Sequence, residues 1–186
     1  MKKFITITLI AAVVAGLSLS GVAIAQEQKY AVTFAPLGLL YGAVHVNFDT
    51  AINKKTSFSS SLGKWILNLG DWSFSSFSSG FGYKMYPKAG ALKGFYWGPR
   101  VEMDLLNVKY SYDYLGVHEE VIAFCTVFTV KLETVYRWIW DGFTLELGGN
   151  IGFASGEILM YTELDKQKYS FTGLNVSPVF NIGMAF

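Results

Sequence analysis

The final segment of the chain, residues 175–186, constrains the fold most strongly because its side chains alternate between two kinds. The even-numbered positions hold large apolar residues, interrupted only by Pro178, and the odd-numbered positions hold mostly Asn, Ser, Gly and Ala. We call each set of alternate positions in a strand a parity. Successive side chains of a strand point to opposite faces, so the alternation predicts a β-strand with one apolar face. A large terminal aromatic residue is a poor ending for a soluble domain, whose last residues usually fray. The apolar positions are Val176, Phe180, Ile182, Met184 and Phe186.

The first 25 residues have the three parts of a secretory signal peptide. Lys2 and Lys3 precede a mostly apolar stretch from residue 4 to 14, and Ala23-Ile24-Ala25 forms a small-residue cleavage site before Gln26. An uncleaved membrane anchor is the alternative, but a spanning helix needs about 20 apolar residues. We therefore expect residues 1–25 to be removed and residues 26–186 to form one domain.

Charge and cysteine content exclude several classes of protein. Without Lys2 and Lys3 the basic residues fall from 15 to 13 against 14 acidic residues, so no basic surface is expected to attract nucleic acid. Cys125 is the only cysteine, which excludes an internal disulfide. No apolar run of about 18 residues follows the signal peptide, so a membrane-embedded chain would have to be a barrel.

The same alternation recurs along the chain and predicts seven strands before the closing one. The clearest runs from Phe124 to Trp138, and Asp141-Gly142 after it is a strong hairpin signal. An even number of strands returns both termini to one side of a membrane. The predicted fold is thus all-β, an eight-stranded antiparallel up-and-down transmembrane β-barrel. The predicted strands lie near residues 30–35, 40–49, 58–69, 72–86, 95–105, 124–138, 143–153 and 175–186.

Three local features leave the strand pattern open. The first strand is either separate or part of a longer strand with a bulge at Pro36. Phe74 is out of phase with Phe77, which favours a bulge at Ser75-Ser76. Pro99 lies within a predicted strand, although it cannot donate a hydrogen bond and a closed barrel offers no free edge.

The longer predicted connections follow the fifth and seventh strands and are expected to face outward, opposite the short periplasmic turns. The first of them is polar and rich in tyrosine, from about residue 108 to 120. Tyr110, Tyr112 and Tyr114 occupy every second position, so they are expected to continue a strand above the membrane, with a recognition patch as the alternative.

The polar parity identifies the inside of the barrel. A water-facing surface would carry many long charged side chains, whereas this parity is mostly Gly, Ser, Thr, Asn and Ala, which suit a narrow interior. Aromatic residues also collect near the predicted periplasmic ends of the strands, where rings favour the lipid headgroup level. The expected aromatic girdle is Trp97, Tyr136, Trp138, Trp140 and Phe143, together with Phe48, Tyr83, Phe95 and Phe186.

Eight charged residues share the polar parity and are expected to form a network in the lumen. Four are acids and four are bases, which predicts a salt-bridged plug, because buried charges are normally paired. A selective ion path is the alternative. Lys64 is the exception, on the apolar parity, and would have to snorkel at a membrane surface. The network comprises Lys84, Arg100, Glu102, Asp104, Lys131, Glu133, Arg137 and Glu146.

No residue set indicates catalysis, a metal or a cofactor. Neither His45 nor His118 is followed two residues later by a serine, as an outer-membrane deacylase would require. The acidic residues beside His118 match no zinc or calcium spacing. Glu102 and Asp104 share a face, but nothing indicates a substrate cleft. We therefore expect a protein that is not an enzyme.

The mature chain resembles small bacterial outer-membrane β-barrels of the OmpW and OmpX type, and uncharacterised short barrels. The likeness covers residues 26–186 and includes the phrases G-F-G-Y-K-M-Y and V-Y-R-W-I-W-D-G-F-T-L-E-L-G. The closing strand resembles a membrane-insertion signal, carried by Phe180, Ile182, Met184 and Phe186.

This resemblance implies a location in the outer membrane of a Gram-negative envelope. Lipid and the barrel-assembly machinery are the implied partners, and no loop ligand can be named. A structural or adhesive role with a plugged lumen is expected. The alternatives are a narrow porin-like passive channel for small apolar solutes and a lipid-modifying enzyme.

Overall fold

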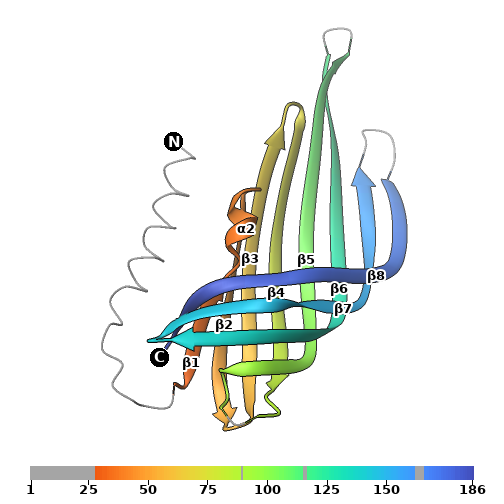
Figure 1. Ribbon diagram of the computed structural model, residues 1–186. Helices are drawn as coiled ribbons and strands as arrows, with labels where there is room; N and C mark the ends of the chain where they lie inside the picture. Colours follow the sequence, from red (N-terminus) through yellow and green to blue (C-terminus); the bar gives the residue numbers. More distant parts are fainter. Residues whose placement is uncertain (1–27, 89, 115–116, 162–165) are drawn as a thin grey trace.

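The structure is a closed ring of eight antiparallel strands, each paired with its neighbours along the chain and β8 with β1 (Figure 1). This computed structural model describes residues 28–88, 90–114, 117–161 and 166–186. The predicted signal peptide lies outside the described residues. The elements are β1 (Tyr30–Phe34), α2 (Pro36–Leu39), β2 (Ala43–Asn53), β3 (Thr56–Leu69), β4 (Trp72–Met85), β5 (Gly94–Tyr114), β6 (Val117–Trp140), β7 (Phe143–Tyr161) and β8 (Lys166–Ala185).

The ring closes with a large stagger. Moving from Val32 to its partner on the next strand, and so on from strand to strand, leads around the barrel to Leu174 of β8. Val32 itself pairs with Met184, so the ring closes with a displacement of ten residues along β8. Stagger and tilt are linked in a barrel, whose strands incline by about 35–45°. In Figure 1, β7 and β8 cross in front of the lower barrel before turning upward. The intermediate partners are Phe48, Ser60, Phe81, Val101, Val130 and Phe153.

The predicted number of strands and the separate first strand are confirmed. β1 ends at Phe34, and Pro36 begins the short helix α2 instead of a bulge, as suits the fixed φ of proline at a helix start. Asp141 and Gly142 both have positive φ and join Trp140 to Phe143 as a two-residue hairpin turn.

Two local predictions are wrong. β4 has no bulge at Ser75-Ser76, because both residues stay in register with Ile66 and Trp65 of β3. Phe74 is out of phase with Phe77 because it lies on the inward parity, where its ring stacks on that of Trp65 with centroids 6.0 Å apart. The segment from residue 108 to 120, expected as a connection, belongs largely to the long β5–β6 hairpin, which rises above the other strands in Figure 1. The expectation that the alternating tyrosines continue a strand is confirmed, because β5 extends to Tyr114.

Pro99 is accommodated by a break in one ladder. β4 and β5 pair up to Gly82 and Arg100 and resume at Met85 and Trp97, so the missing donor of Pro99 lies at an interruption. Next to it, a Cβ at Gly98 would overlap the carbonyl oxygen of Tyr83. Glycine therefore allows the strands to approach closely where proline prevents regular pairing.

The two parities face opposite sides of the barrel as the sequence predicts. The inward parity includes buried serines of β3 at positions 57, 59 and 61. The outward parity carries large apolar side chains such as Leu62, Val130 and Phe153, which are 60%, 61% and 67% exposed. We call the end that holds Tyr30 and Phe186 the terminal end, and the other the hairpin end.

Closure of the ring depends on a glycine. A Cβ at Gly183 would lie 2.6 Å from the Cα of Thr33, because β1 and β8 approach closely there. We expect Gly183→Ala to lower the free energy of unfolding by about 1–3 kcal/mol, the usual cost of overpacking. Urea titration in detergent micelles, followed by the heat-dependent shift in gel mobility, measures this change. Gly173→Ala is the matched control on the same strand, since nothing lies within 4 Å of its Cβ position. Equal effects of both substitutions would contradict the prediction.

Candidate functional site

Four charged side chains form a layer across the lumen near the terminal end, here called the lower layer. They are Asp49, Lys84, Arg137 and Glu146, which come from β2, β4, β6 and β7. Arg137 pairs with both carboxylates, and Lys84 lies 2.9 Å from Asp49 and 3.9 Å from Glu146. The side chains of Arg137 and both acids are 0% exposed. This layer therefore joins opposite walls of the barrel through charges withdrawn from water.

Hydrogen bonds from neutral side chains complete the surroundings of Glu146. The Tyr96 hydroxyl donates to one carboxylate oxygen at 3.0 Å, and the Asn181 amide donates to the other at 2.7 Å. Lys84 and Arg137 also lie over the Tyr96 ring, at 4.6 and 5.6 Å from its centroid. Buried charges need this additional satisfaction, because pairing alone seldom offsets the loss of hydration.

A second group, the upper layer, lies further toward the hairpin end. Glu102 accepts hydrogen bonds from Arg100 at 2.6 Å and from Lys131 at 2.5 Å. Arg100 also lies 3.6 Å from Glu133 and donates to the side-chain oxygen of Asn47 at 3.0 Å. Each layer thus contains two acids and two bases.

Apolar side chains seal the lumen below the two layers. Leu92, in the connection between β4 and β5, is fully buried against Ala31, Ile139 and Ala185. The connection is held under the barrel mouth by hydrogen bonds from the backbone N–H groups of residues 90 and 91 to the carbonyl of Lys54. Leu92 adopts a φ of 76°, which a leucine tolerates only where its surroundings fix it.

The structure brings together seven of the eight predicted lumenal charges. Asp104 is half-buried on the same parity, but no ion pair to it is found among the described residues. The eighth member is instead Asp49, which the sequence places on the polar face of the second strand but whose pairing with Lys84 and Arg137 was missed. The position of Asp49 on the polar parity of its strand was the signal that could have identified it as a lumenal charge. Tyr96 and Asn181 were also missed as members of the site.

The predicted girdle and closing-strand residues lie on the outward parity. Rings of the girdle follow one another along the terminal end: Tyr136 and Trp138 have centroids 4.5 Å apart, and Trp138 and Trp140 6.5 Å. Phe180, Ile182 and Met184 lie on the outward parity at the end of β8, and Phe186, which follows the last residue of β8, is 46% exposed. The Phe186 carbonyl accepts hydrogen bonds from the backbone N–H groups of Lys29 and Tyr30, so the end of the chain is fixed to β1.

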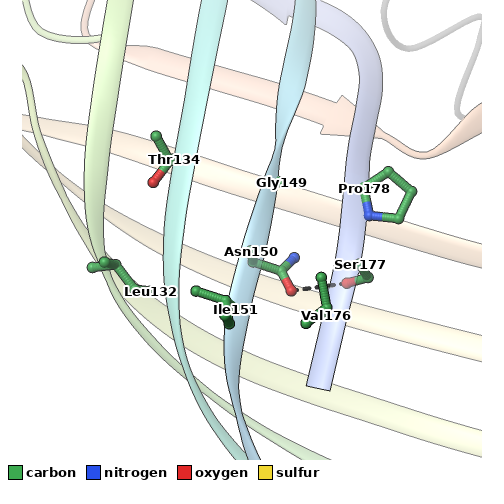
Figure 2. A pocket seen from close by; sticks show the side chains of 8 residues that line it. All are labelled: Leu132, Thr134, Gly149, Asn150, Ile151, Val176, Ser177 and Pro178. Atoms are coloured by element: carbon green, nitrogen blue, oxygen red, sulfur yellow. Dashed lines mark hydrogen bonds between the residues drawn. The ribbon is translucent and has the colours of Figure 1, made fainter. Parts of the chain in front are cut away.

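Two hollows lie on either side of β8. The inner cavity, of 370 Å³, lies on the upper layer and is bordered by His45, Asn150, Asn181 and Leu37 of α2. The outer depression, of 520 Å³, lies on the outward face of β6, β7 and β8 (Figure 2). Gly149 leaves room in it, while Leu132, Ile151, Val176 and Pro178 surround it.

Among the described side chains, His45 and Cys125 form no recognisable reaction centre, and the side chain of His118 lies outside the described part of the structure. His45 borders the inner cavity, and Cys125 is a free, buried thiol on β6. In the part of the chain that the structure describes, no three His, Cys, Asp or Glu side chains are placed to hold a metal ion. Within the same residues, no helix is long and apolar enough to cross a membrane.

Comparisons of the chain with family models, with curated proteins and with solved structures each found no match.

Proposed function

We propose that the chain is an integral outer-membrane barrel whose lumen is closed to ions and whose role is structural or adhesive. It would be a barrel of the same general kind as OmpW and OmpX, exported by its signal peptide. Insertion would proceed through the barrel-assembly machinery, with the closing strand as the recognised segment. It would perform no catalysis. The observation that carries the closed lumen is that each of the four charged groups of the lower layer is in an ion pair at 0–3% side-chain exposure.

The outward face supports a place in lipid. Large apolar side chains cover most of it, with Lys64 of β3 as an exposed exception between Leu62 and Ile66, and so extensive an exposed apolar surface is untypical of a soluble monomer. Towards the hairpin end charged residues appear on this face as two exposed ion pairs, Lys109 with Glu120 and Glu157 with Lys168. Towards the terminal end the apolar surface stops at the aromatic girdle. A band with aromatic rings at its border and charges beyond it is what a transmembrane barrel presents to a bilayer.

The role is the display of the long β5–β6 hairpin on a rigid support. β5 and β6 pair continuously from Gly94 and Arg137 to Tyr114 and Val117, so the hairpin is held by one uninterrupted ladder. Loops and hairpin tips on rigid scaffolds commonly carry recognition.

Planar-bilayer recording tests the closed lumen. We expect the purified full-length protein to give no reproducible conductance steps, because both layers and Leu92 lie across the path. The triple variant Arg100→Gln, Glu102→Gln and Glu133→Gln removes most of the upper layer and should also stay silent, since the lower layer remains.

A known general porin in the same bilayer is the positive control for this recording. Steps of conductance in the unmodified protein whose ion selectivity changes in the triple variant would refute the closed lumen. The membrane proposal has its own test: a protein that stays soluble without detergent would contradict it.

A further inference from the structure

Exposed lysines gather on two neighbouring connections at the terminal end. Lys54 and Lys55 form the turn between β2 and β3, and Lys88 and Lys93 lie in the connection between β4 and β5. All four residues are exposed. Neither connection contains an acidic residue. We call these four residues the lysine patch.

Backbone hydrogen bonds hold the two connections together. The carbonyl of Lys54 accepts from the N–H groups of residues 90 and 91 at 3.1 and 2.9 Å, and the carbonyl of Lys55 accepts from that of residue 86 at 2.7 Å. The connection between β4 and β5 is also fixed by its buried leucine. The two connections lie side by side at the bottom of the barrel in Figure 1. The four lysine side chains therefore start from one fixed surface and not from independent loops.

Other charges at the terminal end are few. Among the residues that the structure describes, they are Lys29 before β1 and Asp141 in the turn between β6 and β7. Lys29 lies beside the end of the chain, because its backbone N–H donates to the Phe186 carbonyl. The described exposed charges beyond the apolar band at the hairpin end are balanced, with three acids and three bases, namely Asp71, Glu120, Glu157, Lys109, Lys166 and Lys168. The lysine patch is therefore a local excess of positive charge.

The lysine patch lies at the border of the outward apolar band. Ile52, which is 57% exposed, is two residues before Lys54, and Phe95, which is 44% exposed, is two residues after Lys93. An extended chain advances only about 3.3 Å per residue, and a lysine side chain can lay its stem along apolar surface. The ammonium groups therefore lie near the level of the aromatic girdle, which in a bilayer is the level of the headgroups.

We propose that the lysine patch binds the phosphate groups of anionic phospholipids in the periplasmic leaflet of the outer membrane. This inference rests on the proposed place in that membrane, with the terminal end toward the periplasm. Four lysines held close together repel one another, and a headgroup of net negative charge supplies the missing counter-charge at that depth. A lysine close to an anionic membrane surface adds about fivefold to the affinity.

A headgroup fits the position of the lysine patch better than a protein or polymer of the periplasm does. The two connections are short, residues 54–55 and residues 86–93, and the second is folded against the mouth of the barrel. Neither carries its lysines far beyond the girdle. The patch is therefore level with the lipid phosphates and does not extend into the periplasm.

Native mass spectrometry of the purified protein tests the proposal. The detergent micelles contain equal amounts of phosphatidylglycerol and phosphatidylcholine, and we expect the protein to retain phosphatidylglycerol preferentially. The triple variant Lys55→Gln, Lys88→Gln and Lys93→Gln should bind phosphatidylglycerol at least about tenfold more weakly, because it loses three of the four attractive charges. Its binding of phosphatidylcholine should not change. The heat-dependent shift in gel mobility checks that the variant is folded.

A second triple variant is the matched control. Lys109→Gln, Lys166→Gln and Lys168→Gln remove the same number of charges at the hairpin end and should leave the preference unchanged. Equal losses in both triple variants would show that only the net charge matters and would overturn the proposal. Displacement of the lipid by inorganic phosphate, at an ionic strength matched with chloride, would show a site for the free anion and overturn the assignment to lipid.

The remaining outcomes separate this inference from the proposed function. Equal binding of the two lipids by the unmodified protein would overturn the inference and leave the membrane assignment intact. Cosedimentation with purified peptidoglycan that is lost in the first triple variant, without a preference for phosphatidylglycerol, would assign the lysine patch to that polymer and also overturn it. A protein that stays soluble without detergent would overturn the membrane assignment and this inference together.

Discussion

Replacing Glu146 by leucine should be among the most damaging single changes in the lumen. The carboxylate receives hydrogen bonds from Arg137, Tyr96 and Asn181, and all of these donors lose a partner inside the barrel. Removing one partner of a buried ion pair costs about 3–5 kcal/mol, because the remaining charge stays buried without compensation. Urea unfolding of the folded protein in detergent or lipid, followed by gel mobility, measures the loss.

The exposed ion pair on the same strand provides the control. Glu157 lies 2.7 Å from Lys168 with both side chains more than half exposed, so Glu157→Leu should change the free energy of unfolding by less than about 1 kcal/mol. The double variant Glu146→Leu with Arg137→Leu should lose less than the sum of the single changes, since the two residues share partners. Additive losses would show that the lower layer does not act as one network.

Replacing Val130 by arginine should destabilise the barrel strongly if its outer face lies in lipid. Val130 is 61% exposed on the outward parity of β6, near the middle of the apolar band. An arginine on the lipid face at the bilayer midplane costs about 2–4 kcal/mol. In a water-soluble barrel the same change at so exposed a position would be nearly neutral, within about 0.5 kcal/mol. Equilibrium unfolding from lipid vesicles distinguishes the two cases.

Thr172→Arg is the matched control for this experiment. Thr172 is an exposed outward residue of β8, between the apolar band and the ion pair of Lys168. Its replacement should cost less than about 1 kcal/mol, because the penalty falls towards the membrane surface. Equal costs at Val130 and Thr172 would contradict a lipid band centred on Val130.

Alternation with a period of two was sufficient to predict the eight strands and their inward and outward faces. It is weaker in the segment from residue 108 to 120, where the start of β6 carries polar residues at consecutive positions 118–120, although the alternating tyrosines of β5 did indicate a continuing strand. It also misled at Phe74, where the inward face itself becomes apolar. A departure from alternation was interpreted as a bulge, although the backbone stays regular and only the surroundings change.

The composition of the lumenal site followed from parity, but its pairing did not. The pairing of each acid with a base depends on the stagger between strands. This stagger cannot be determined from the residue pattern within any one strand. Asp49 bonds to Lys84, 35 residues away, and to Arg137, 88 residues away. The short pairing of β1 with β8, from Ile182 to Ala185, could not be predicted either, because it depends on where β1 stops.

If the barrel spans a membrane as proposed, the arrangement of eight lumenal charges in two neutral layers sets how these layers respond to voltage. A potential of 100 mV does work of about 2.3 kcal/mol on each elementary charge that crosses a membrane. Each layer carries two positive and two negative groups, so the forces on its members cancel. An applied voltage therefore has no net charge by which to displace either layer, so the proposed closure of the lumen should not depend on the polarity of the field.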